Sequence, residues 1–333
     1  MHGQTKKKIA YFASLTLLFS YIEMILPRTV PFFKLGLGNI AMLMALELNF
    51  SSFLVLSIIK SLSSSLISGT LFSPFFIISI AQSVLSAILM SLLFKLNKIS
   101  EKKLFSIYGI SVAGSALSAF VQIFCCALYL GAGTFALLGP ILIFNTITGF
   151  LTAFISEKFF LSSQIDFENF EFELNTTEKS TFAVGQAFLL VLILFGAVSV
   201  FFIKNIYVLL FAMILGFALQ KICKRKILIL PHIWLWIFVF VSSIFVPEGK
   251  ILFRLWNISI TQGALMTFLQ KSLRLSTVSA LSQCAISVKP PQNTLLALTL
   301  LYYRTLSDRF RQAEGSVFQK TKAVLYGKSE KLS

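Results

Sequence analysis

The chain has 333 residues, of which 56% are hydrophobic and 13% are charged, and its mean hydropathy is +0.85. Soluble domains carry about 25% charged residues, so this composition excludes an ordinary soluble protein and predicts an all-α polytopic membrane protein. The formal net charge of +16 would suggest nucleic acid in a soluble protein, but here the basic residues cluster beside apolar runs. That pattern is typical of cytoplasmic loops facing anionic lipids, and no nucleic-acid partner is expected.

The first 160 residues (1–160) predict a unit of six membrane helices joined by short loops. Lys6, Lys7 and Lys8 precede the first apolar run and place the N-terminus in the cytoplasm. Runs of about 20 apolar residues suffice to cross a bilayer, and six spans are expected at 9–26, 36–50, 52–68, 74–94, 105–129 and 136–156. The basic loop that follows the fourth span agrees with a cytoplasmic N-terminus.

Residues 161–180 differ in composition and mark a domain boundary. They hold five of the 13 acidic residues of the chain, which predicts a solvated cytoplasmic linker, with docking on a basic partner as the alternative. Residues 181–333 predict a second membrane unit of about four to five helices, with spans near 182–203, 205–220 and 227–246 and a helical run to about 288.

Two features set the end of the chain apart. Lys271 and Arg274 lie on the apolar run before 288, so that run is not a simple lipid-facing span. The stretch 294–314 predicts an amphipathic cytoplasmic helix that carries Arg304, Arg309 and Arg311, and the basic tail from Ser316 is expected to be frayed. Both termini are therefore expected in the cytoplasm, and the protein in the inner (cytoplasmic) membrane of the cell.

The sequence offers little for catalysis or metal binding. Its only aspartates are Asp166 and Asp308, too few for the converging carboxylates that magnesium and pyrophosphate chemistry needs. Gly327-Lys-Ser329 is not a Walker A motif, because Lys322 stands where that motif has its first glycine. His232 stands alone, and the four cysteines form no CxxC pair. We therefore expect no enzyme activity, no metal site and no directly bound cofactor.

The stretch Pro31–Ile40, between the first two apolar runs, is the candidate capping loop of a ligand site. Glycine lets the backbone approach a ligand closely, and lysine and asparagine offer hydrogen-bond donors. A ligand role is favoured over helix packing for the loop residues Lys34, Gly36, Gly38 and Asn39.

Few polar residues are expected inside the membrane: Glu23, Lys34, Asn39, Glu47, Lys60, Gln82, Gln122 and Asn145. Such groups usually face the bundle interior or a water-filled cavity, and hydrogen bonding between helices is the alternative role. The two roles are equally open for Gln82 and Gln122. Glu23 either pairs with Arg28 or Lys34 or contacts a substrate. Gln122 and Asn145 are predicted to close the site from below.

Two motifs carry a family resemblance, Lys34-Leu-Gly-Leu-Gly-Asn-Ile40 and Gly109-Ile-Ser-Val-Ala-Gly114. With them, residues 6–158 resemble the Gx family of substrate-binding (S) components of energy-coupling factor (ECF) transporters, also called heptaprenyl diphosphate synthase component I. Ser118-Ala119 stand where the family often has His-Asn. The resemblance implies a six-helix bundle that captures a small substrate, and a face of the first helix, here Ala10 and Ala13, that packs on the coupling partner.

Residues 181–325 resemble, more weakly, the transmembrane coupling (T) component of the same transporters. The similar segments are Glu248–Arg254, Ile258–Leu265, Lys271–Leu275 and Leu296–Arg304. The resemblance implies ABC-type ATPase subunits as partners, which would use the ATP and would be contacted by Arg304, Arg309 and Arg311. A separate T component is a further partner that it allows.

These features predict a fused membrane subunit of an ECF-type ABC transporter that takes up a small vitamin-like or isoprenoid-related substrate. The alternative is a membrane accessory or anchor protein, without transport, for isoprenoid, quinone or flavin-linked redox enzymes. A membrane-embedded prenyltransferase is disfavoured because carboxylates are so few.

Overall fold

A computed structural model describes residues 3–25, 36–68, 70–100, 104–161, 184–225, 227, 229–245, 249–255, 258–284 and 294–326. The predicted linker lies outside these residues, apart from its first position. The elements in chain order are α1 (Gly3–Ile25), α2 (Gly38–Met44), α3 (Phe50–Ser68), α4 (Pro74–Ile99), α5 (Ile107–Leu130), the 3₁₀ helix η1 (Ala132–Leu137), α6 (Leu138–Leu161), α7 (Val184–Phe202), α8 (Ile206–Ile222), α9 (Ile229–Ile244), β1 (Ile251–Leu255), β2 (Ile258–Thr261), α10 (Gln262–Cys284), α11 (Leu295–Gln312) and α12 (Val317–Tyr326).

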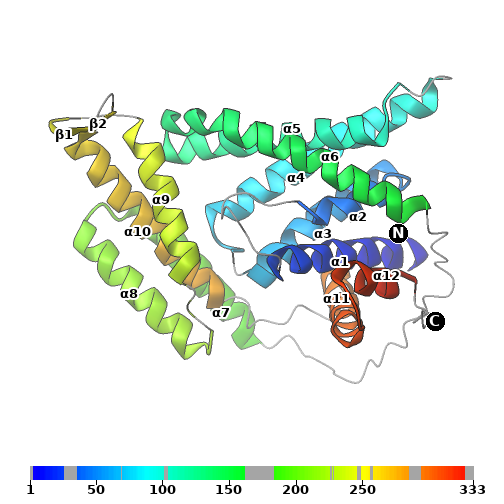
Figure 1. Ribbon diagram of the computed structural model, residues 1–333. Helices are drawn as coiled ribbons and strands as arrows, with labels where there is room; N and C mark the ends of the chain where they lie inside the picture. Colours follow the sequence, from blue (N-terminus) through cyan, green and yellow to red (C-terminus); the bar gives the residue numbers. More distant parts are fainter. Residues whose placement is uncertain are drawn as a thin grey trace.

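The helices form two bundles, which lie side by side in Figure 1. Helices α1–α6 make the N-terminal bundle, and α10 packs against α7, α8 and α9 in the second. Among the described residues, four segments are long and apolar enough to cross a membrane, namely α3, α4, α5 and the η1–α6 pair, and α7, α8 and α9 carry shorter apolar stretches. Large apolar side chains such as Phe195 and Tyr207 point outward, 75% and 84% exposed. The chain is therefore a helical membrane protein.

Local sequence signals explain where several helices begin. Helix α4 starts at Pro74, whose missing N–H costs nothing at the first turn. The Ser106 hydroxyl caps α5 by accepting a hydrogen bond from the Gly109 N–H, and Thr294 caps α11 through the Ala297 N–H. From α3 onward the predicted apolar runs coincide with helices to within a few residues.

The second predicted span, 36–50, differs from the structure. Helix α2 has seven residues, a length of about 10 Å, and cannot cross a hydrocarbon core of about 30 Å. The chain then turns at residues 45–48, where Glu47 is exposed, and continues as α3. All residues of α2 except Asn39 are buried, so the segment enters the bundle and ends inside it.

A two-stranded antiparallel sheet, β1 with β2, stands where the sequence predicted no strands. Its register shifts between Ile251 and Phe253, and Gly249 precedes it with a φ of +81°. This positive φ suits glycine because other residues are strained there. The hairpin joins the end of α9 to α10, so it is the turn between these two helices.

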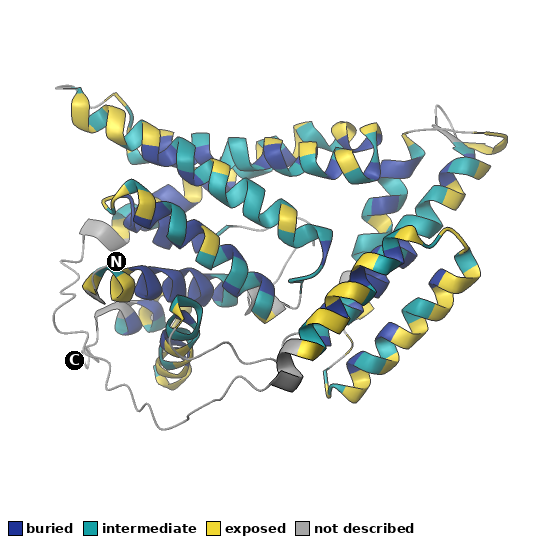
Figure 2. Cartoon of the chain, turned by 180° about the vertical axis from the view of Figure 1, so that it is seen from behind, coloured by how far each residue is buried: buried dark blue, intermediate teal, exposed yellow. Residues whose placement is uncertain are grey.

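The C-terminal helices pack on the N-terminal bundle, across the whole length of the sequence. Tyr302, Leu306 and Phe310 of α11 and Val324 of α12 belong to the same buried cluster as α1. Figure 2 shows α1 buried along most of its length. The tail from Ser316 was predicted to be frayed. Its described part instead contains α12, because Val324 packs on an apolar surface.

We expect Leu306→Ala to weaken this docking. Leu306 is fully buried, and removing a buried leucine side chain typically costs about 2–5 kcal/mol. Hydrogen exchange of α1 and α11 should rise as the contact opens. Leu301→Ala is the matched control, since Leu301 lies on the same helix and is 37% exposed. Equal exchange in the two variants would show that α11 is not held by this face.

The two cations on α10 have partners at helix ends. Lys271 Nζ donates to the carbonyl oxygen of Leu130 at the end of α5, at 2.7 Å. Arg274 Nη2 donates to the carbonyl oxygen of Ile203, just after α7, also at 2.7 Å. A cation near the last carbonyls of a helix is favourable. These contacts explain the two charged residues on α10. Through its bond to Leu130, Lys271 also links the second bundle to the first.

Candidate functional site

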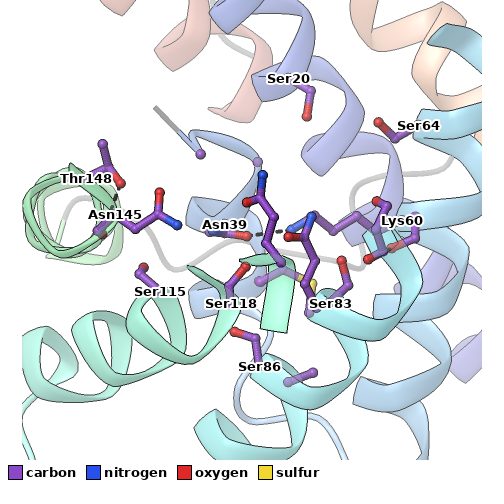
Figure 3. Close-up of a pocket in the computed structure, with 18 of the residues that line it drawn as sticks. Ser20, Asn39, Lys60, Ser64, Ser83, Ser86, Ser115, Ser118, Asn145 and Thr148 are labelled. Carbon is purple, nitrogen blue, oxygen red and sulfur yellow. Dashed lines mark hydrogen bonds between the residues drawn. The ribbon is translucent and has the colours of Figure 1, made fainter. Parts of the chain in front are cut away.

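A cavity of about 220 Å³ lies inside the N-terminal bundle. Its walls come from α1, the start of α2, and α3 to α6, as the close-up in Figure 3 shows. The described lining residues are Ser20, Glu23, Gly36, Gly38, Asn39, Met42, Lys60, Ser61, Ser64, Ser79, Gln82, Ser83, Ser86, Ala87, Met90, Ser115, Ser118, Gln122, Ile141, Asn145 and Thr148. Fifteen of these 21 side chains can form hydrogen bonds, so the cavity is polar although its bundle is apolar.

Two glycines shape the entry of the chain into this site. Gly36 has a φ of +69°, and its carbonyl accepts a hydrogen bond from the Asn39 N–H at 2.8 Å. A Cβ on Gly38 would lie 2.8 Å from Ser20 Oγ and 3.1 Å from the Thr16 carbonyl oxygen. Glycine is therefore needed at Gly36 for a turn and at Gly38 for close packing on α1, and together they place Asn39 at the cavity wall.

Asn39 and Lys60 meet in the wall of the cavity. Lys60 Nζ donates a hydrogen bond of 2.5 Å to Asn39 Oδ1, drawn as a dashed line in Figure 3. Lys60 lies near the middle of α3, a membrane-span candidate, where a charged side chain requires polar partners. This hydrogen bond links the segment that carries Gly36 and Gly38, here called the glycine segment, to α3.

Glu23 of α1 is 8% exposed and contributes a carboxylate to the lining. Its Oε2 atom accepts a hydrogen bond from the Leu37 N–H at 3.2 Å. No donor among the described residues contacts its Oε1 atom, and the same holds for Oε1 of Gln82. The site therefore contains buried acceptors that lack donors within the described part of the chain.

Eight serines line the cavity. Several donate their hydroxyl protons to backbone carbonyls, as Ser20 does to Thr16 (2.8 Å) and Ser86 to Gly114 (2.9 Å). A hydroxyl that is satisfied in this way keeps lone pairs with which it can accept from a bound solute. The serines thus give the cavity many neutral acceptors at little cost to the apolar bundle.

Five of the six predicted substrate residues line this single cavity: Gly36, Gly38, Asn39, Gln122 and Asn145. The sixth, Lys34, lies outside the described residues. The sequence analysis did not select the serines or Lys60 for the site, although it placed Lys60 within the membrane. A signal was present, because Ser115, Ser118 and Gln122 repeat at the three- and four-residue spacing of one helix face.

The residues predicted to contact partner subunits fall into two groups. Ala10 and Ala13 are fully buried within the cluster that includes α11. Arg304, Arg309 and Arg311 lie on the exposed side of α11. The hydrogen bond that Arg311 donates to the Tyr21 hydroxyl (3.4 Å) raises the pKa of the guanidinium, so this contact with α1 is made by a charged side chain.

The fold and the cavity define a helical membrane protein with an internal polar site. Comparison with known families gives two matches along the chain. Residues 12–159 match the family model of heptaprenyl diphosphate synthase component I. Residues 179–288 match a domain of unknown function, DUF8519. Searches of curated proteins and of solved structures give no match. The N-terminal bundle is thus related to a family of membrane components, and the second bundle falls in a separate matched region.

Proposed function

We propose that this chain is the membrane subunit of an ECF-type ABC transporter and that its N-terminal bundle captures a small solute for ATP-driven uptake. The observation that carries the proposal is the cavity of the N-terminal bundle, whose lining is dominated by hydrogen-bonding side chains. Polar side chains inside a membrane bundle are energetically costly. A bound solute explains their presence, because it would form hydrogen bonds with them. The match of residues 12–159 to a membrane component family supports the same half of the proposal.

In this proposal the second bundle and α11 couple the cavity to separate ATPase subunits. Helix α11 packs on α1, and α1 supplies Ser20 and Glu23 to the cavity. A force applied to the exposed arginines of α11 would therefore reach the wall of the site. The chain itself would bind no ATP and catalyse no reaction. Its basic loops would face anionic lipids, with both termini in the cytoplasm and the protein in the inner membrane.

Co-purification tests the coupling half. The full chain, co-expressed with the two ATPase subunits of an ECF transporter from the same cell, should retain them on an affinity column. Reversing charge at Arg304, Arg309 and Arg311 together should reduce the retained ATPase at least tenfold. Lys204→Glu is the control, because this lysine is exposed and lies after α7, outside α11. Absence of ATPases in every nucleotide state would exclude the coupling role.

A second candidate function has an observation of its own. A groove of about 570 Å³ lies among α8, α9 and α10, with apolar lining residues such as Phe217, Trp236 and Phe240. Such a surface suits an isoprenoid chain, in line with the name of the family that the first bundle matches. The chain would then anchor isoprenoid, quinone or flavin-linked redox enzymes. Co-purification of a polyprenyl synthase in place of ATPases would favour this role.

A further inference from the structure

The charges in the cavity restrict what it can hold. Among the described lining residues the ionisable groups are one carboxylate, Glu23, and one ammonium, Lys60. Lys60 donates to Asn39 Oδ1 at 2.5 Å, so part of its donor capacity is used within the wall. From the described residues the carboxylate of Glu23 receives one hydrogen bond, from the Leu37 N–H to Oε2, and its Oε1 atom receives none. Glu23 is therefore the ionisable group of the lining that has an unsatisfied acceptor atom.

An unsatisfied buried carboxylate oxygen requires a partner. Glu23 is 8% exposed, and its Oε1 atom has no donor among the described residues. An ionised carboxylate removed from water is costly unless it is paired and hydrogen-bonded. Gln82, in α4, carries a second buried acceptor, Oε1, without a described donor. Both side chains line the cavity, so a solute with N–H or O–H donors and a positive charge would complement them.

The size and lining of the cavity exclude a long apolar ligand. Its volume of about 220 Å³ is below the range of pockets for drug-sized ligands. Only four of the described lining side chains are apolar: Met42, Ala87, Met90 and Ile141. A prenyl chain would leave the serine hydroxyls and amides facing hydrocarbon.

We infer that the cavity takes a small polar solute that carries a protonated amine, and that this amine is held by Glu23. The inference rests on the proposed solute-binding role and names the class of its substrate. The ammonium of the solute donates to Glu23 Oε1 and Gln82 Oε1. Serine hydroxyls and the amides of Gln122 and Asn145 contact its remaining polar atoms.

The test uses the full chain purified in mild detergent. Small molecules that co-purify with it are released, treated with an amine-specific tag and identified by mass spectrometry. An amine-bearing solute should be present in the unaltered protein and reduced at least tenfold in Glu23→Gln, which keeps the shape of the side chain and removes its charge. Glu47→Gln is the matched control, because Glu47 is exposed and does not line the cavity.

A titration covers the case in which nothing co-purifies. Glycine, β-alanine, 4-aminobutyrate and ethanolamine are each compared with the analogue in which a hydroxyl replaces the amine. At least one amine should bind ten times more tightly than its analogue, and Glu23→Gln should abolish the difference. If no amine binds in either experiment, the inference is wrong.

Other outcomes separate this inference from the proposed function. Suppose that the bound solute has no amine, and that Glu23→Gln retains this solute while an Asn39 variant loses it. The amine inference would then be refuted, and the proposed solute-binding role would stand. If Glu23→Gln lowers thermal stability and leaves the bound solute unchanged, Glu23 has a structural partner, such as Arg28 or Lys34, and the inference fails. Loss of ATPase retention in the co-purification experiment concerns the coupling role alone.

Discussion

Gly133→Ala is expected to separate the two bundles where η1 meets α9. A Cβ built on Gly133 would lie 2.1 Å from the carbonyl oxygen of Ser242 and 3.1 Å from the Cβ of Phe245. The first of these atoms belongs to the backbone, so no side-chain rotation can relieve the clash. Inserting one extra carbon into a packed site typically costs about 1–3 kcal/mol. At this distance we expect the upper end of that range, or dissociation of the contact.

The control for this substitution is Gly139→Ala, two positions into α6, because a Cβ there would meet no atom within 4 Å. Hydrogen exchange by mass spectrometry should show faster exchange in η1 and α9 for Gly133→Ala and no change for Gly139→Ala. Lys271 donates a hydrogen bond to the carbonyl oxygen of Leu130 at the end of α5. This bond should weaken as the two bundles separate. Unchanged exchange in both variants would mean that η1 and α9 do not pack as described.

In the proposed transport role, the N-terminal bundle would move as a rigid body during capture and release of the solute, and this movement would depend on the same contact. Here that unit is held at one end by η1 against α9 and along α1 by α11. Gly133 lies at the first contact and Leu306 at the second. A tilt of the bundle therefore requires α11 to move with it and the η1–α9 contact to open, which Gly133→Ala would favour.

Most helices after residue 50 were predictable from sequence because they are long periodic or apolar runs, and several of them begin at a local boundary signal. Pro74 begins α4, and Ser106 and Thr294 cap α5 and α11. The short α2 was not predictable, because apolar content alone gives no reason for a helix to end at Met44. The packing of α11 on α1 joins segments about 290 residues apart in sequence, as the bond from Arg311 to Tyr21 illustrates, and no local pattern encodes it.

The candidate site was predictable in part. The glycine segment could be found because lysine, asparagine and two glycines are unusual between two membrane spans. The serines were missed because each alone is common in membrane helices, where it bonds to its own backbone. Only their shared face indicates a cavity, as with Ser79, Ser83 and Ser86 on α4. Lys60 was recognised as polar and intramembrane, and its pairing with Asn39 required the fold.

Asn39→Leu is expected to destabilise the protein and to abolish solute binding. The change removes Oδ1, which accepts the 2.5 Å hydrogen bond from Lys60, and leaves the ammonium facing a leucine. A hydrogen bond to a charged group contributes about 1.5–3 kcal/mol, and a lysine at the centre of a membrane helix costs about 2.5–3.5 kcal/mol. We therefore expect a loss of about 2–3 kcal/mol, measured by chemical unfolding in detergent.

Adding Lys60→Met to Asn39→Leu should restore much of that stability, since it removes the cation that had lost its hydrogen bond to Asn39 Oδ1. Solute binding should stay absent, because the polar side chains of both Asn39 and Lys60 are gone from the wall. Ser64→Ala is the control within the same cavity, since it deletes one neutral hydroxyl. In a double-mutant cycle the two substitutions should be non-additive by more than about 0.5 kcal/mol. Strict additivity would show that Asn39 and Lys60 do not depend on one another, and the glycine segment would then have no electrostatic tie to α3.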